Sequence, residues 1–195
     1  MLCGVGGQGI LFAAKVIAAS AEAAGLQVTT NELHGMAQRG GSVTAQVRFG
    51  EELFSPLFAP GEADALFGME PVEALRWAHY LRPGGQAVVS LARLIPVTVS
   101  MGQATYPADV EERLRRVFGG LRLVDGAEVA SSLGDARLVN TVLLGALSAH
   151  LPLAASCWEA AFRRIVRPQL LEANLRAFAS GRGEAPKGRP LISRG

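Results

Sequence analysis

Cysteines, aromatic residues and long apolar runs are all scarce in this chain of 195 residues. Its two cysteines, Cys3 and Cys157, are too few and too far apart for an iron–sulfur cluster, which needs about four thiolates, or for a zinc site. No apolar run reaches the roughly 18 residues of a membrane-spanning helix, since Lys15, Ser20 and Glu22 interrupt the longest one. The amino end also lacks the basic stretch of a signal peptide. We therefore expect a cytoplasmic protein with reduced thiols and no membrane contact.

A strong excess of one charge is missing too, because the net charge is only +2. Four of the 19 basic residues and one of the 17 acidic residues fall in the last sixteen residues, which leaves 15 basic and 16 acidic residues in the body. A nearly neutral body gives no electrostatic footprint for a nucleic-acid partner. Residues 181–195 are basic and rich in Gly and Pro, so we expect them to form a disordered tail.

Hydrophobic residues make up 49% of the chain, which is enough for one domain with a large core. Strand and helix patterns alternate over the first two thirds, and this predicts a Rossmann-like three-layer α/β/α fold with a mostly parallel, mixed sheet. The pattern then turns helical, so we expect one domain over residues 1–180 with a helical part over 126–180. The expected strands cover residues 1–3, 26–30, 42–49, 64–69, 86–91, 95–100 and 121–124, and the expected helices begin near residues 9, 70, 109, 137, 157 and 168.

The first of these strands is short for a central strand, which usually runs about five or six residues. Two explanations stay open at this point. Either the natural protein starts upstream of Met1, or a compact edge is tolerated here.

A glycine-rich turn follows that strand. Gly4, Gly6 and Gly9 satisfy G-x-G-x-x-G between a strand and a helix, and Gly7 and Gln8 add a flexible residue and an amide at the helix start. In dinucleotide-binding folds such glycines allow a tight turn and let the backbone approach a phosphate at the helix amino end. A tight corner of this kind also needs glycines when no ligand is present, so the motif alone does not establish nucleotide binding.

The densest polar stretch runs over residues 32–42. It begins at Glu32, near the place where a dinucleotide fold carries its ribose-binding acid. His34 has the chemistry of a general base and Arg39 that of a forked carboxylate or phosphate contact, but no nucleophile or spaced metal ligand accompanies them. We therefore expect a ligand or partner contact rather than catalysis. The candidate contact residues of this stretch are Glu32, His34, Gly35, Met36, Gln38, Arg39, Gly40 and Ser42.

Together the two segments resemble the gamma-type domain of 2-oxoacid:ferredoxin oxidoreductases, and most of all the small (beta) subunit of the indolepyruvate-type members. The resemblance is carried by GVGGQGIL at residues 4–11 and NELHGMAQRGGSV at residues 31–43. It continues in SPL at 55–57, MEPVEALR at 69–76, NTVLLGAL at 140–147 and NLRAFASG at 174–181. It thus spans nearly the whole chain except the basic tail.

The resemblance implies an enzyme complex that converts a 2-oxoacid, CoA and oxidised ferredoxin into an acyl-CoA, CO2 and reduced ferredoxin. It implies that thiamine diphosphate and the [4Fe–4S] clusters lie on a larger partner subunit and that this chain alone is inactive. The chain would then bind neither group itself. The glycine turn and the stretch from His34 to Ser42 would form one contact surface near the partner's active site, close to the path of CoA.

Two other functions stay open on the residues alone. One is an NAD-dependent dehydrogenase that uses Gly4, Gly6, Gly9 and Glu32, although no second domain for a substrate is evident. The other is a non-enzymatic assembly module of the same fold.

Overall fold

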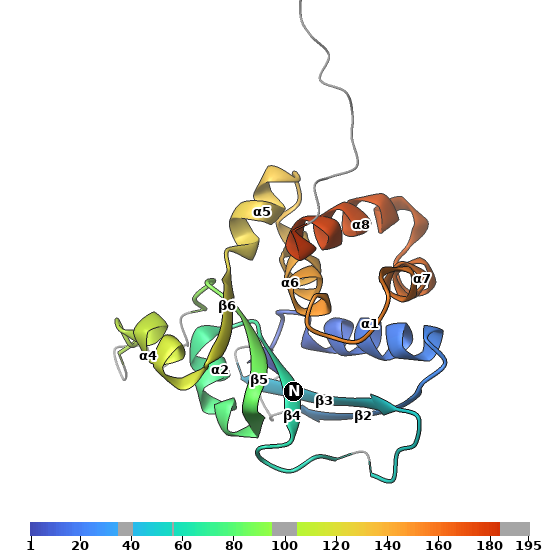
Figure 1. The fold of residues 1–195 in the computed structure, drawn as a ribbon. Helices are drawn as coiled ribbons and strands as arrows, with labels where there is room; N and C mark the ends of the chain where they lie inside the picture. The colour runs from blue at the N-terminus through green and yellow to red at the C-terminus, as the bar shows by residue number, and fades with distance from the viewer. Residues whose placement is uncertain (35–40, 56, 95–104, 184–195) are drawn as a thin grey trace, which may run out of the picture.

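The computed structural model describes residues 1–34, 41–55, 57–94 and 105–183 (Figure 1). Six strands form one sheet in the order β2-β3-β1-β4-β5-β6. The strands are β1 (Leu2–Val5), β2 (Gln27–His34), β3 (Ser42–Gly50), β4 (Ala63–Gly68), β5 (Leu81–Ser90) and β6 (Gly120–Val124). The expected strand over residues 95–100 lies outside the described residues.

The sheet has an antiparallel half and a parallel half. Strand β3 runs antiparallel to both β2 and β1, whereas β1, β4, β5 and β6 are all parallel. The prediction of a mostly parallel, mixed sheet is therefore confirmed. Because β3 is antiparallel to β1, the start of β3 lies beside the carboxyl end of β1, where Ser42 is opposite Val5.

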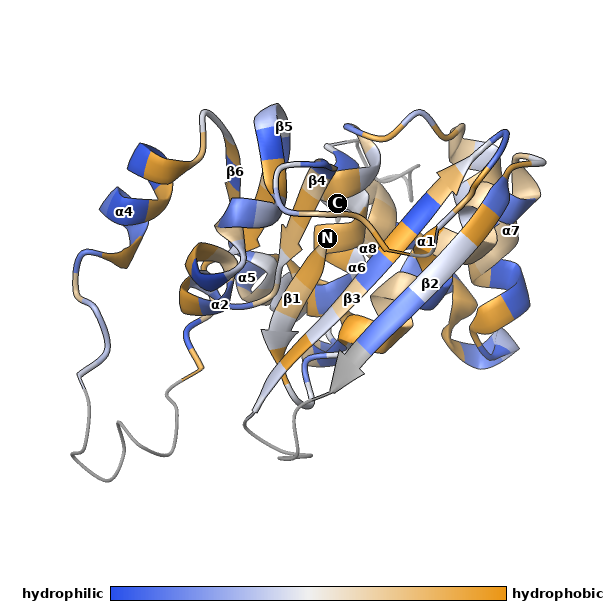
Figure 2. Cartoon of the chain, turned by 90° about the horizontal axis from the view of Figure 1, so that it is seen from below, coloured by the Kyte–Doolittle hydropathy of each residue, from blue (hydrophilic) through white to orange (hydrophobic). Residues whose placement is uncertain are grey.

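Helices cover both faces of the parallel half, as the three-layer prediction requires. On one face α6 packs against β4, β5 and β6, and α1 packs mainly against β2 and β3, with α7 and α8 outside these two helices. Helices α2 and α4 pack on the other face (Figure 1). From below, β2 and β3 have no helix over their outer face (Figure 2). The helices are α1 (Ile10–Ala23), α2 (Pro71–Arg76), α4 (Val110–Val117), α5 (Gly126–Ser132), α6 (Val139–Ser148), α7 (Ala155–Ile165) and α8 (Pro168–Arg182), with short 3-10 helices η1 (Ala78–Tyr80) and η2 (Ala136–Leu138).

Helix α6 is apolar on nearly all sides, and the structure explains why. Every residue of α6 after Val139 is buried, because the sheet lies on one side of the helix and α8 on the other. A Cβ atom at Gly145 would collide with the carbonyl of Phe178, and one at Gly181 with the carbonyl of Val142, so the two helices touch through their backbones. This contact fixes the C-terminal helices to the sheet.

Several element boundaries differ from the prediction: β1 runs on to Val5, and β5 begins at Leu81 and not at residue 86. Strand β2 continues past Thr30 to His34, because its residues pair with β3 over the whole length of that strand. Helix α8 runs to Arg182 and ends at Gly183, which has a φ of 85°. Residues 181–182 therefore belong to the helix and not to the expected tail, and residues 184–195 lie outside the described part. Among the described residues, no helix is long and apolar enough to cross a membrane.

Candidate functional site

The glycine turn connects the carboxyl end of β1 to the start of α1. Gly7 and Gly9 have φ angles of 100° and 78°, in the left-handed region that favours glycine. Gly9 is the N-cap of α1 and offers no side chain to the free N–H groups of the first turn. Of the motif glycines, Gly4 lies within β1 and not in the turn, and the left-handed conformations occur at Gly7 and Gly9 and not at Gly4 or Gly6.

Gln8 is held by its own chain. Its Oε1 accepts a hydrogen bond from Val5 N at 2.8 Å, and its Nε2 donates to Met69 O at 3.0 Å. A Cβ at Gly4 would lie 2.9 Å from Gln8 Oε1, which explains the glycine at that position. The Gln8 amide therefore ties the ends of β1 and β4 together.

Asn140 supports the same turn from α6. Its Nδ2 donates to Gln8 O at 3.0 Å and to Gly9 O at 2.6 Å, while its buried Oδ1 has no hydrogen-bond partner among the described residues. A Cβ at Gly9 would lie only 2.5 Å from Asn140 Nδ2. In the sequence, an asparagine within an apolar helix indicates a hydrogen bond to backbone. The sequence does not indicate the partner, which is more than 130 residues away.

The end of the polar stretch lies directly beside the glycine turn. Gly6 N donates to Gly41 O at 2.9 Å. Ser42 Oγ donates to Glu73 Oε2 at 2.5 Å and lies 3.4 Å from Trp77 Nε1. The structure thus brings Ser42 and the glycine turn together at the sheet edge that we call the carboxyl edge, formed by the ends of β1 and β4 and the start of β3.

The other residues of the polar stretch are placed differently. Glu32 is exposed in β2 opposite Ala45, and the backbone of His34 ends that strand opposite Val43. The side chain of His34 and all of Gly35, Met36, Gln38, Arg39 and Gly40 lie outside the described residues. Because β3 separates β2 from β1, Glu32 is not on the strand next to the glycine turn, where a dinucleotide fold places its ribose-binding acid.

Sequence reasoning missed a buried carboxylate at this edge. Glu70 caps α2, and its Oε2 accepts from Val72 N at 2.7 Å and from Glu73 N at 3.0 Å. Tyr106 Oη donates to Glu70 Oε1 at 2.6 Å, and burial, together with this bond, raises the pKa of Tyr106. The Glu-Pro pair that starts α2 signals the cap, but nothing in the sequence links it to Tyr106.

A crevice of about 620 Å³ borders the glycine turn. Gly7, Gln8 and Gly9 form one side of it, and the starts of α6 and α8 form the other. Two arginines line it: Arg137, which pairs with Asp135 at 2.8 Å, and Arg167. The crevice lies at the carboxyl ends of parallel strands, which is where open α/β sheets bind their ligands.

The carboxyl edge offers contacts rather than a complete catalytic set. Among residues 1–34, 41–55, 57–94 and 105–183, no three His, Cys, Asp or Glu residues are grouped as a metal site. Cys3 is fully buried, and burial raises the pKa of its thiol, so it remains protonated.

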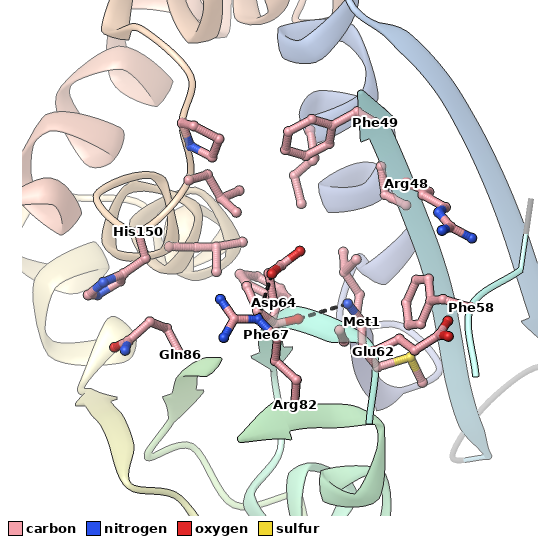
Figure 3. A pocket seen from close by; sticks show the side chains of 18 of the residues that line it. Met1, Arg48, Phe49, Phe58, Glu62, Asp64, Phe67, Arg82, Gln86 and His150 are labelled. Carbon is pink, nitrogen blue, oxygen red and sulfur yellow. Dashed lines mark hydrogen bonds and ion pairs between the residues drawn. The ribbon is translucent and has the colours of Figure 1, made fainter. Parts of the chain in front are cut away.

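A second cavity lies at the opposite end of β1, at the sheet edge that we call the amino edge (Figure 3). Its volume is about 510 Å³, and none of the site residues expected from sequence lines it. The Met1 amino group lies within it and donates to Ala65 O at 2.9 Å.

Comparison with known proteins agrees with this architecture. Residues 1–184 match the family model described as pyruvate ferredoxin/flavodoxin oxidoreductase. Indolepyruvate oxidoreductase subunit IorB of Thermococcus kodakarensis is 41% identical over 186 residues, which cover 93% of this chain and 92% of the relative. The subunit of the same name from Archaeoglobus fulgidus is 37% identical over 194 residues, or 97% of this chain and 96% of the relative.

A solved structure shows the same fold at lower identity. The gamma subunit of the keto/oxoacid ferredoxin oxidoreductase from Geobacter sulfurreducens superposes with a TM-score of 0.67 and 22% identity, covering 92% of this chain and 93% of that one. The family match spans both the glycine turn and the C-terminal helices that support it. The chain therefore belongs to the pyruvate ferredoxin/flavodoxin oxidoreductase family.

Proposed function

We propose that this chain is the small subunit of an indolepyruvate-type 2-oxoacid:ferredoxin oxidoreductase. The complex would decarboxylate an arylpyruvate oxidatively, pass two electrons to ferredoxin and transfer the acyl group to CoA. The observation that carries the proposal is an identity of about 40% to indolepyruvate oxidoreductase subunits along almost the whole length of both chains.

The cofactors of this reaction belong, in our proposal, to a larger partner subunit. A [4Fe–4S] cluster needs about four thiolates, and this chain has two cysteines. Of these, Cys3 is buried in β1 and Cys157 lies on α7. Thiamine diphosphate would supply the carbanion chemistry on the partner, and this chain would shape part of the surface around it.

The carboxyl edge is the surface that we assign to this contact. It combines the glycine turn, Ser42 and the crevice with Arg137 and Arg167, all at one end of the parallel strands. In this assignment the stretch from His34 to Ser42 extends the surface toward the partner and the path of CoA. The backbone N–H groups at the start of α1 and the arginines favour a negatively charged group there.

The function is tested by reconstitution with the partner. The chain should be co-expressed with a large subunit that carries a thiamine-binding region and clustered cysteines. We expect indolepyruvate- and CoA-dependent reduction of ferredoxin from the complex and none from either subunit alone. Decarboxylation by this chain alone, or a brown colour of the purified chain, would refute the proposal. Saturable binding of NADH by the chain would support a dehydrogenase instead.

The contact surface is tested separately. Replacing Gln38→Ala and Arg39→Ala together should lower turnover or weaken assembly of the complex. Arg116→Ala on α4 is the matched control, because that side chain is 71% exposed and pairs only with Glu112 among the described residues. Unchanged kinetics and an intact complex in the double variant would remove residues 38 and 39 from the surface.

A further inference from the structure

The crevice beside the glycine turn lies on one side of the sheet. Its residues come mainly from α1, η2, α6, α8 and the end of α7. Ser42 faces the other side of the sheet, because its hydroxyl bonds Glu73 of α2. The volume of the crevice, about 620 Å³, falls within the range of roughly 300–1,000 Å³ that is usual for small-molecule sites. The crevice is thus a hollow of its own within the carboxyl edge, separate from the Ser42 contact.

The walls of the crevice are largely apolar. They include Phe12 of α1, Val139 of α6, Ile165 of α7 and Leu170 of α8. All four side chains are only partly buried. Apolar surface that several elements leave open around one hollow favours an occupant with an apolar body of its own, because burying both surfaces removes them from water.

The crevice also favours negative charge. The start of α1 borders it, and the first N–H groups of that helix have no carbonyl of their own helix to bond and no side-chain cap. Asp135, the one acid among the described residues of the lining, is paired with Arg137 at 2.8 Å. Arg167 is exposed and forms no ion pair within the described part of the chain. Its guanidinium is therefore available to a carboxylate.

Asn140 supplies an unused acceptor in the crevice wall. The residue is 7% exposed, and its Nδ2 is bound to the carbonyl oxygens of Gln8 and Gly9. The amide cannot turn over, because its oxygen would then face those two carbonyl oxygens. Oδ1 therefore stays without a donor among the described residues, and a buried oxygen in that state costs free energy. A ligand with an N–H group on its apolar part can supply the donor.

We propose that the crevice is a binding site, formed by this chain alone, for an indole-type carboxylate. The carboxylate binds Arg167 in the positive field of the α1 start, the ring lies among the apolar side chains, and the ring N–H donates to Asn140 Oδ1. The choice of an indole ring rests on the proposed function. The requirement for an anion with an apolar body rests on the crevice itself.

Isothermal titration calorimetry of the full chain with indole-3-acetate tests this site. Indole-3-acetamide has the same ring without the charge, and acetate has the charge without the ring. We expect saturable binding of indole-3-acetate, and binding at least about tenfold weaker for either control, because each control loses one half of the recognition. Naphthalene-1-acetate keeps a ring and the charge but has no N–H group, and should bind about threefold or more weakly.

Two variants place the ligand in the crevice. Arg167→Gln should weaken binding of indole-3-acetate about tenfold or more, because it removes the charge that meets the carboxylate. Arg163→Gln is the matched control, since Arg163 is exposed on α7 and is not part of the lining. Ala173→Trp fills the crevice from α8 and should abolish binding without changing any charge.

Equal affinity for indole-3-acetate and indole-3-acetamide would overturn the proposal, and so would unchanged affinity in Arg167→Gln or Ala173→Trp. Tighter binding of CoA than of indole-3-acetate would overturn it too, because the crevice would then be a nucleotide site. Equal affinity for naphthalene-1-acetate would overturn the hydrogen bond to Asn140. None of these measurements involves the partner subunit or ferredoxin, so a failure of the proposed function would appear only in the reconstitution.

Discussion

The two ends of β1 are built in opposite ways. At the carboxyl end, Gln8 and Asn140 hold the glycine turn by four hydrogen bonds to backbone atoms, and Gly6 is tied to Gly41. At the amino end, Met1 makes two hydrogen bonds with β4, from its amino group to Ala65 O and from Phe67 N to its carbonyl oxygen, beside a cavity of about 510 Å³. The carboxyl end of β1 is thus held in place by contacts from distant parts of the chain, whereas the amino end lies beside unfilled space.

This difference between the two ends of β1 indicates that each end has its own role. A turn that is fixed by α6, β3 and β4 presents its backbone in one conformation, which suits a surface for a partner or ligand. Changes at the amino end of β1 should instead alter the free energy of unfolding. Changes at the two ends should therefore be distinguishable, and four measurements test that.

The largest effect that we expect is a pH dependence of stability in the chain that starts at Met1. The pKa of its buried amino group is about 5 when folded and 8.0 when unfolded. Between these values the unfolded chain binds a proton that the folded chain does not, so the free energy of unfolding rises with pH and falls as pH drops from 8 to 5. One pKa unit corresponds to about 1.4 kcal/mol, so the loss reaches about 4 kcal/mol.

Urea unfolding at pH 5 and pH 8 measures this loss. The matched control is the same chain with an acetylated amino terminus, which has no charge to lose. The difference in unfolding free energy between the two chains should grow as pH falls. A difference that stays constant with pH would mean that the amino group is hydrated in the folded protein.

The next effect belongs to the carboxyl edge and compares two glycines of one turn. Gly9→Ala forces a side chain into a left-handed conformation and against Asn140 Nδ2, so we expect a loss of about 2–4 kcal/mol. Gly7→Ala has the same backbone problem but open space around it, and should lose only about 1–2 kcal/mol. Chemical unfolding of the two variants measures the difference, and equal losses would show that Asn140 moves aside freely.

This turn also shows what the sequence can predict. The glycine spacing, the helix that follows and the alternating pattern of residues 42–49 all depend on local rules, and α1 and β3 form where those rules place them. The contacts that make the turn rigid are not local. Asn140 reaches it from α6, and Gln8 reaches Met69 across the sheet, so only the folded chain reveals them.

Strand order is the second thing that the sequence does not show. Residue 32 lies in the second strand of the chain, and a dinucleotide fold would bring that strand next to the first. Here β3 takes that place because it pairs with β2 and β1 on its two edges. Long-range pairing of this kind decides which polar residues meet, and hence that Ser42 rather than Glu32 lies beside the glycine turn.

A smaller effect tests the buried carboxylate of the carboxyl edge. Tyr106→Phe removes the hydrogen bond to Glu70 Oε1 and should lower the free energy of unfolding by about 1–2 kcal/mol at pH 7. Tyr80→Phe is the control, since the Tyr80 hydroxyl makes no hydrogen bond with the described residues. An equal loss of unfolding free energy in the control would show that removing any tyrosine hydroxyl has this effect. The hydrogen bond to Glu70 would then not be its cause.

The smallest effect lies on α4, away from both ends of β1. Glu112 and Arg116 form an ion pair at 2.7 Å, but their side chains are 70% and 71% exposed. Water and salt screen such a pair, so Glu112→Ala should change the free energy of unfolding by no more than about 0.5 kcal/mol, and by less in 1 M salt. A loss above about 1 kcal/mol would show that α4 responds to surface changes as strongly as the turn does. The contrast between the two ends of β1 would then not be specific to them, because any substitution in the chain would give effects of the same size.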